Sequence, residues 1–169
     1  MNGNCHFMVG GAMGVATCLL TQTDATATTL IISTCLIGSI FPDIDSPNSH
    51  FGQLTKPLST IISKFNRKGS QHRGLLHALL IYVCGLILSY LYFKPILGFF
   101  IGAISHLFLD TFNPSGIPLL FLYKNRLHLG KVRSDSPYCT CISIIVFVEL
   151  LFISIDLTLQ GIYIPLAML

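Results

Sequence analysis

The chain has 169 residues, of which 52% are hydrophobic and only 10% are charged, with a formal net charge of +3. Soluble domains carry about 25% charged residues, and the mean hydropathy of +0.71 is correspondingly high. This composition excludes a soluble enzyme, a disordered chain and a nucleic-acid-binding module with a broad basic face. It predicts an all-α protein, an integral membrane helical bundle.

Five apolar stretches predict about five hydrophobic helices, at residues 5–20, 26–41, 72–93, 96–112 and 138–159. The third and fifth have about 22 residues each, which is enough to span a bilayer. The first two have about 16 residues each, fewer than the usual 20. We therefore expect them to form a tight hairpin that thins the bilayer or enters it only in part. The fourth is borderline in length.

We expect a single membrane-embedded domain over residues 1–169. It divides into a helical hairpin (1–41), a loop with a short interfacial helix (42–71), a second hairpin (72–112), a loop (113–137) and a last transmembrane helix (138–160). The amphipathic segment 54–65 has the apolar spacing of an interfacial helix. Nine of the ten basic residues lie in or beside the two long loops, so the positive-inside rule places these loops in the cytoplasm.

The fourth stretch carries two ionisable residues, which are costly at membrane depth and usually functional. His106 and Asp110 are four residues apart and therefore share one helix face. Gly98 and Gly102 precede them on the same face, and a stripe of small residues favours close helix packing. His6 begins a similar stripe in the first stretch. The simpler interpretation of His106 and Asp110 is a hydrogen-bonded pair that ties helices together.

Two further groups of polar residues lie at helix ends. Asp43 and Asp45 follow Pro42, where the second stretch is expected to stop, and such a pair suits oxygen-ligand metals and zinc alike. The simpler interpretation is a turn with solvated acids. His72 and His77 open the third stretch, and they could instead be a satisfied pair of interfacial histidines.

The hairpin topology brings these groups to the same side of the membrane at similar depth. The candidate metal ligands are His6, Asp43, Asp45, His72, His77, His106 and Asp110. Without a partner, each of these groups would cost several kcal/mol in apolar surroundings, and a bound divalent ion offsets that cost. Mixed histidine and aspartate ligation favours zinc, manganese or iron over calcium, and seven candidates allow one or two ions.

Other polar residues have weaker assignments. His50 could join the site from its loop, whereas His128 is expected to be structural or exposed. Glu149 lies near mid-membrane by count and could pair within the bundle. The six cysteines show no disulfide framework, and we expect most of them to be buried, unreactive thiols.

Several motifs together resemble the YdjM family, a bacterial group described as LexA-regulated, membrane-bound, metal-dependent hydrolases. The resemblance covers roughly residues 3 to 130. Its motifs are Pro42-Asp43-Ile44-Asp45-Ser46-Pro47, Gly52-Gln53, His72-Arg73-Gly74-x-x-His77 and His106-Leu107-x-x-Asp110-x5-Gly116-Ile117-Pro118-Leu119-Leu120, with His6 near the N-terminus.

The resemblance implies a hydrolase in the bacterial inner membrane, with several spans and a site that faces the cytoplasm. The order of the candidate ligands is also similar, more distantly, to the zinc-dependent phospholipase C and P1 nuclease group. That similarity implies a phosphoester substrate and zinc. A second downstream His-x3-Glu motif is absent from this sequence, so one or two ions are expected rather than three.

We expect a water molecule activated by the metal to be the nucleophile. One of Asp43 and Asp45 would ligate the ion, and the other would act as general base or orient the water. Arg73, together with Arg126, would hold an anionic group such as a lipid phosphate. The depth of the site favours a lipid or lipid-linked substrate.

The alternative function is a metal or proton transporter without hydrolytic activity, because buried histidines and acids also line ion pathways. A transporter would carry its site near the midplane, whereas the candidates here gather at one end. A structural scaffold would leave the ligand cluster unexplained. The bilayer is the expected partner, and the sequence does not specify an oligomeric state.

Overall fold

The computed structural model describes residues 3–21, 23–65, 75–119 and 126–132, together with residues 137–138, 140–141, 144–145, 147–148 and 152. The α-helices in these ranges are α1 (Gly3–Thr21), α2 (Ala25–Ile40), α3 (His50–Leu54), α4 (Lys56–Phe65), α5 (Leu79–Tyr92) and α6 (Leu97–Thr111). The 3-10 helices are η1 (Phe41–Asp45), η2 (Leu75–His77) and η3 (Lys94–Ile96). Strands β1 (Ile117–Pro118) and β2 (Arg126–Leu127) form one short antiparallel pair. The predicted all-α fold is confirmed.

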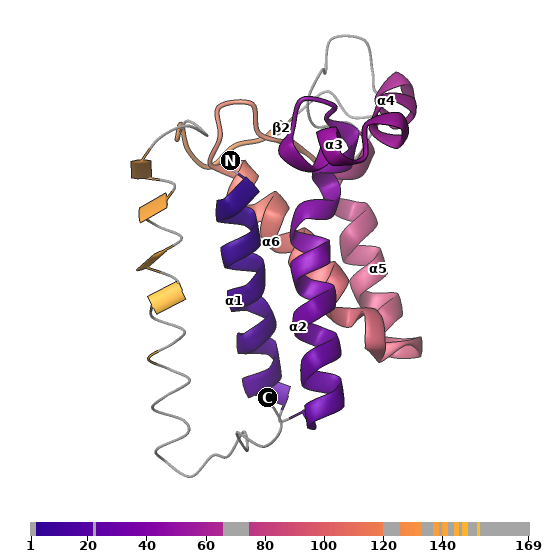
Figure 1. The fold of residues 1–169 in the computed structure, drawn as a ribbon, viewed down its shortest axis with the longest axis vertical. Helices are drawn as coiled ribbons and strands as arrows, with labels where there is room; N and C mark the ends of the chain where they lie inside the picture. The colour runs from indigo at the N-terminus through magenta and orange to yellow at the C-terminus, as the bar shows by residue number, and fades with distance from the viewer. Residues whose placement is uncertain are drawn as a thin grey trace.

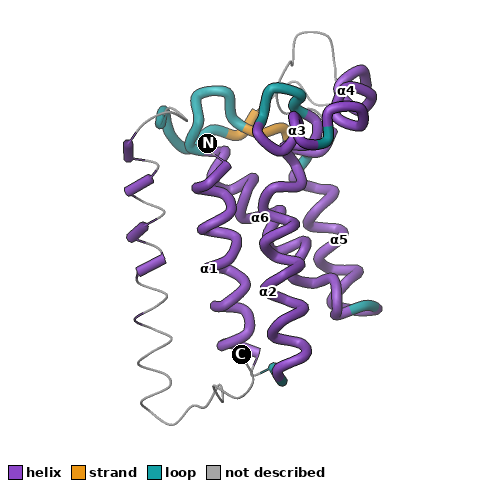
Figure 2. Tube along the Cα trace, in the orientation of Figure 1, coloured by secondary structure: helices purple, strands orange, loops and turns teal. Residues whose placement is uncertain are grey.

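The four apolar helices α1, α2, α5 and α6 run along the long axis of the molecule (Figure 1). Helix α6 contacts α1, α2 and α5 and is the central helix of the described bundle. The short helices α3 and α4 and strand β2 lie together at one end of the bundle, which we call the loop end (Figures 1 and 2). The hairpin topology places the start of α1 and the ends of α2 and α6 at this loop end.

Helices α2 and α6 pack backbone to backbone because glycine occupies the contact points on both. A Cβ atom at Gly102 would overlap the carbonyl group of Cys35, and one at Gly38 would overlap the backbone of Phe99. The predicted stripe of small residues on α6 therefore serves helix packing. This close approach fixes the register of α6 against α2.

Helix α1 approaches α2 in the same way. A Cβ atom at Gly10 would overlap the Ser39 side chain. The Cys35 thiol donates a hydrogen bond to the Gly10 carbonyl oxygen at 3.0 Å. The stripe that begins at His6 is thus also a packing surface, and it holds the first turn of α1 beside the end of α2.

The expected helix lengths were wrong for the first and third stretches, whereas α2 has the expected 16 residues. Helix α1 has 19 residues, and the segment Ala25–Asp45 continues through η1 for 21 residues; both are long and apolar enough to cross a membrane. Pro42 lies in the first turn of η1, where its missing N–H leaves no bond unmade, so the segment continues beyond it. Helix α5 begins only at Leu79 and has 14 residues.

The loop end is closed by a small apolar core and by helix α4. Tyr82, Leu107 and Ile117 are buried together there with Ala103. The predicted amphipathic helix is present at Lys56–Phe65, with apolar side chains such as Leu58 and Ile61 exposed.

The structure also bears on the expectations about the cysteines and about the last apolar segment. Cys5 takes part in a disulfide bond, which the cysteine pattern did not predict. Cys18 and Cys35 are buried free thiols as expected, whereas the free thiols of Cys84 and Cys141 are exposed, contrary to the expectation. The last predicted helix (138–160) lies mostly outside the described residues, and Glu149 is among those not described. The described side chains of that segment, such as Phe152, are exposed.

Candidate metal centre

Six of the seven candidate ligands are described, and all six gather at the loop end. His6 comes from the first turn of α1, Asp43 and Asp45 from η1, His77 from the end of η2, and His106 and Asp110 from the last two turns of α6. Five of these side chains are at most 2% exposed, and only Asp43 is partly accessible, at 20%. Polar side chains from four separate segments are therefore buried together at one position.

His106 has a defined proton position. Its Nδ1 atom lies 2.6 Å from the backbone carbonyl oxygen of Ser39, and a carbonyl oxygen can only accept, so Nδ1 carries a hydrogen and donates it. In the neutral ring Nε2 then presents a lone pair. This Nε2 atom is buried without a hydrogen-bond partner, 3.7 Å from Asp43 Oδ1 and 3.7 Å from Asp110 Oδ2.

His77 repeats this arrangement with a carboxylate in place of the carbonyl. Its Nδ1 atom donates to Asp45 Oδ2 at 3.2 Å. Its Nε2 atom has no hydrogen-bond partner and lies 3.6 Å from Asp110 Oδ2. A histidine that ligates a metal almost always donates its other N–H to a carboxylate or a carbonyl group. Asp45 is therefore placed to orient His77.

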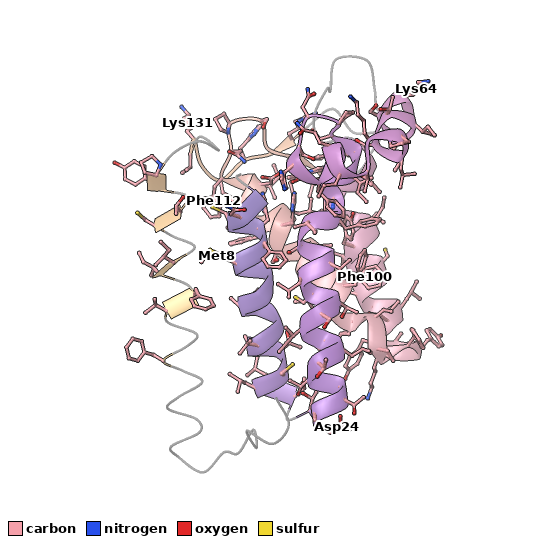
Figure 3. All side chains as sticks on the ribbon, in the orientation of Figure 1. Met8, Asp24, Lys64, Phe100, Phe112 and Lys131 are labelled. Atoms are coloured by element: carbon pink, nitrogen blue, oxygen red, sulfur yellow. The ribbon has the colours of Figure 1, made fainter. Side chains whose placement is uncertain are left out.

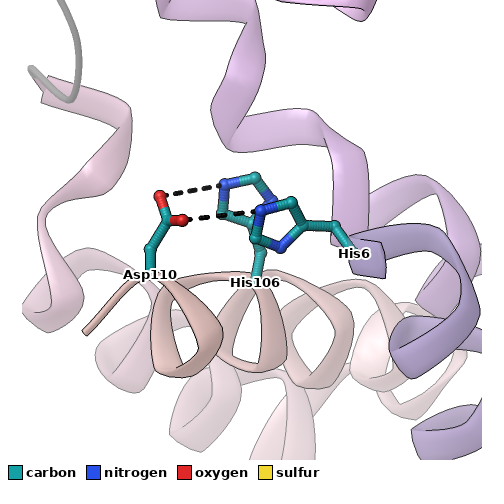
Figure 4. A group of neighbouring side chains, drawn as sticks. All are labelled: His6, His106 and Asp110. Carbon is teal, nitrogen blue, oxygen red and sulfur yellow. Dashed lines mark ion pairs between the residues drawn. The ribbon is translucent and has the colours of Figure 1, made fainter. Parts of the chain in front are cut away.

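Asp110 lies between three imidazole rings. Its Oδ2 atom faces His77 and His106, and its Oδ1 atom lies 3.5 Å from His6 Nε2. The His6 ring stacks on the His106 ring with centroids 3.7 Å apart, and Figure 4 shows both rings turned toward the carboxylate. The side-chain amide of Asn113, itself buried, donates to Asp110 Oδ1 at 3.0 Å.

Asn113 was missed by the sequence analysis. The signal was its position three residues after Asp110, which is within reach of that carboxylate when the helix ends in a turn. The backbone carbonyl of Ser39 was missed as well, and no side-chain pattern could have revealed it.

The distances between facing atoms fit a bound cation better than direct hydrogen bonds. A protonated histidine would draw a carboxylate oxygen to about 2.7–2.9 Å, whereas the separations at His6, His77 and His106 are 3.5–3.7 Å. Zinc bonds to nitrogen and oxygen of about 2.0–2.2 Å place neighbouring ligands of a tetrahedron about 3.3–3.6 Å apart. The residues present therefore could hold a metal ion.

Two overlapping groups of ligand-type atoms meet this condition. The first is His6, His106 and Asp110, and the second is Asp43, His77 and His106; in each group the atoms lie within 4.8 Å of one another. Both groups depend on His106, which has only Nε2 to offer. They therefore describe overlapping positions around one atom.

The charge around His77 also favours a cation. Burial lowers the pKa of His77, but the Asp110 and Asp45 carboxylates outweigh that effect and raise the pKa to about 9. Asp110 and Asp45 thus stabilise a positive charge on the His77 ring. A divalent ion would replace the proton as the source of that charge.

The structure does not show any of the remaining candidates at the metal centre. His72 and Arg73 lie outside the described ranges, so their predicted roles stay predictions. Arg126 donates a hydrogen bond to the Ser115 carbonyl oxygen at 3.1 Å, and its proposed contact with substrate also stays a prediction. His50 and His128 are exposed, as expected for His128.

Replacing Asp45 with asparagine should weaken metal binding without removing a ligand. The amide can still occupy the site, but its oxygen accepts the hydrogen bond from His77 Nδ1 less strongly than a carboxylate does, so the ring is less basic and less well oriented. Loss of such a supporting partner typically costs about 10–100-fold in metal affinity, and zinc titration of the purified protein measures it. Asp24→Asn is the matched control, since Asp24 caps α2 at the opposite end of the helix. An unchanged affinity in Asp45→Asn would refute the assigned role.

Comparisons with known proteins agree with the sequence motifs. The family model described as "YdjM inner membrane protein" matches residues 1–168. The chain is 33% identical over 107 residues to "Inner membrane protein YdjM" of Escherichia coli (strain K12), and equally to the protein of that name in Shigella flexneri; the match covers 59% of this chain and 53% of each relative. The chain thus spans about half the length of the curated relatives it matches. No solved structure matches it.

The family match extends over nearly the whole chain, including the segments that carry all six described ligand candidates. It also agrees with the apolar composition and with two helices long enough to cross a membrane. This protein belongs to the YdjM family of inner membrane proteins.

Proposed function

We propose that this protein is a membrane-embedded, metal-dependent hydrolase that cleaves a phosphoester of a lipid or lipid-linked substrate at the cytoplasmic face. The observation that carries the proposal is the set of buried imidazole nitrogens, His77 Nε2 and His106 Nε2, that face Asp110 without hydrogen-bond partners. Each of these rings uses its other nitrogen to donate to a fixed acceptor. This arrangement supports a catalytic metal centre, with zinc as the expected ion.

The ligands would be His77, His106 and Asp110, with His6 and Asp43 at the edges of the same site. When bound, the ion supplies Lewis acidity, which lowers the pKa of a water molecule toward neutrality. Asp43 is the partly exposed member of the cluster, so it lies where water and substrate would enter. Its carboxylate would accept the proton from an attacking water molecule.

The charge distribution supports a cytoplasmic site and an anionic substrate. Lys64 and Lys131 lie at the loop end with the candidate centre, whereas Asp24 lies at the opposite end (Figure 3). Positive loops remain in the cytoplasm, and the same cations would attract a phosphate-bearing headgroup. The choice of a phosphoester rests on the distant resemblance to the phospholipase C and P1 nuclease group.

The position of the centre argues against the transporter alternative. Among the described residues, no carboxylate or imidazole lies between the loop end and Asp24 at the opposite end. There α2 and α6 meet through glycines and the Cys35 backbone. A metal or proton pathway would need ionisable groups along this contact.

Removal and return of the metal tests the proposed function. The purified chain in lipid nanodiscs should release phosphate or a phosphorylated headgroup from a bacterial lipid extract when zinc or manganese is present. Chelation should abolish this release, and added zinc should restore it, because the nucleophile depends on the ion. His128→Ala should behave like the unmodified protein, since its side chain is exposed. Hydrolysis that persists after chelation, or ion flux into vesicles without hydrolysis, would contradict the proposal.

A further inference from the structure

An apolar groove of about 630 Å³ lies along α6 and is also lined by residues of α1 and α5. Its walls include Val9 and Met13 of α1, Leu86 of α5 and Ile101 of α6. Among the described lining residues, Ser105 contributes the only polar side chain, and its hydroxyl donates a hydrogen bond to the Gly102 carbonyl oxygen at 2.7 Å. The described part of the lining therefore presents carbon almost throughout.

The groove begins beside the candidate metal centre. Ser105 and Leu109 in its wall directly precede His106 and Asp110, and Val9 lies one helical turn beyond His6. Phe112 and Val132 close it at the loop end, where Val132 N donates to the Phe112 carbonyl oxygen at 2.8 Å, and Figure 3 shows Phe112 at the level of the first turns of α1. From there the groove continues along the bundle toward Met13 and Ile101.

We propose that this groove seats one hydrocarbon chain of the membrane lipid whose phosphate group lies at the metal centre. The inference rests on the proposed function and names its substrate more closely, as a lipid with at least one long acyl or prenyl chain. The groove lies on helices at membrane depth, where the surrounding medium is hydrocarbon, and a lining of carbon admits only an apolar occupant. Its volume lies within the range of about 300–1,000 Å³ usual for small-molecule sites.

The last apolar segment of this chain is a competing occupant. Its described side chains do not fill the groove, because Tyr138, Ile145 and Phe152 are 72%, 55% and 67% exposed. A lipid chain is therefore favoured over this segment, and the experiment distinguishes the two.

The probe is a phosphatidic acid that carries a photoreactive diazirine on one acyl chain, added to the full chain with zinc in nanodiscs. Labelling should concentrate on the peptides that contain Met13 and Ile101. Ile101→Trp should lower that labelling about tenfold, because an added ring overpacks a groove of fixed shape. Ile87→Trp is the matched control, since Ile87 is exposed on α5 and does not line the groove. Met13→Trp provides a second blocked variant from the other wall.

The outcomes separate this inference from the proposed function. Labelling of the groove that falls in both blocked variants, without any hydrolysis of the lipid, would support binding of a lipid chain in the groove and contradict the proposed hydrolase activity. Hydrolysis with labelling spread evenly over the helices, or with equal labelling in Ile101→Trp and Ile87→Trp, would overturn binding of a lipid chain in the groove. The proposed hydrolase activity would then still stand. Labelling that rises only after deletion of residues 138–169 would assign the groove to the last segment. If a blocked variant unfolds, the labelling map of the unmodified protein still decides, because an unlabelled groove overturns the inference.

Discussion

Replacing His106 with alanine is expected to abolish metal binding and, with it, hydrolysis. His106 Nε2 belongs to both groups of converging ligand atoms, so no arrangement of the remaining residues replaces it. Changes to supporting residues cost about 10–100-fold in metal affinity, and loss of this ligand should exceed that range. Metal content of the purified protein and release of phosphate from lipid measure the two effects.

His50→Ala is the matched control for this prediction. It removes the same imidazole from an exposed position at the start of α3, outside both groups of ligand atoms. The control should retain bound zinc and full hydrolysis. A His106→Ala protein that is folded and still binds zinc with unchanged affinity would show that the cluster is a structural polar network.

Replacing Gly102 with alanine is expected to destabilise the bundle and to disturb the metal centre at a distance. The new Cβ atom would overlap the Cys35 carbonyl group and crowd the Ser39 amide, so α6 must move away from α2. Overpacking of this kind costs about 1–3 kcal/mol. The movement would also stretch the bond between His106 Nδ1 and the Ser39 carbonyl oxygen, which is 2.6 Å long, so metal affinity should fall with stability.

Thermal unfolding and zinc titration of the same preparations test both parts. Gly3→Ala is the control, because no atom lies within 4 Å of a Cβ built at that position. A Gly102→Ala protein with unchanged stability would mean that α2 and α6 tolerate a wider separation. Reduced stability with normal zinc affinity would separate helix packing from the orientation of His106.

Much of the candidate site followed from the sequence because of two simple regularities. Side chains four residues apart share a helix face, which paired His106 with Asp110. Antiparallel helices return to the same end of a bundle, which brought His6, Asp43 and His77 to that pair. Neither regularity depends on exact helix lengths, so the clustering of these side chains was predicted correctly although some helix lengths were wrong.

Helix lengths were less predictable because hydropathy does not mark where a helix begins. The third apolar stretch starts near residue 72, but helix α5 begins at Leu79 after the 3-10 turn of η2. Ala78 between them is extended, and this local geometry turns His77 toward Asp45 and Asp110. Pro42 was expected to stop the second stretch, and α2 does end at Ile40; the chain then continues as the 3-10 helix η1, which tolerates Pro42 in its first turn.

The amino-acid sequence by itself determined a membrane bundle and the chemistry available at one end of it. Apolar composition and the order of histidines and aspartates are properties of the chain alone, and they do not require knowledge of any contact. The division of labour within the cluster was decided only by the tertiary structure. Ser39 and Asp45 fix which nitrogen of His106 and of His77 carries the proton, and these acceptors come from other segments. Their positions depend on how closely α2 and α6 approach, and that approach is set by backbone contact at Gly38 and Gly102.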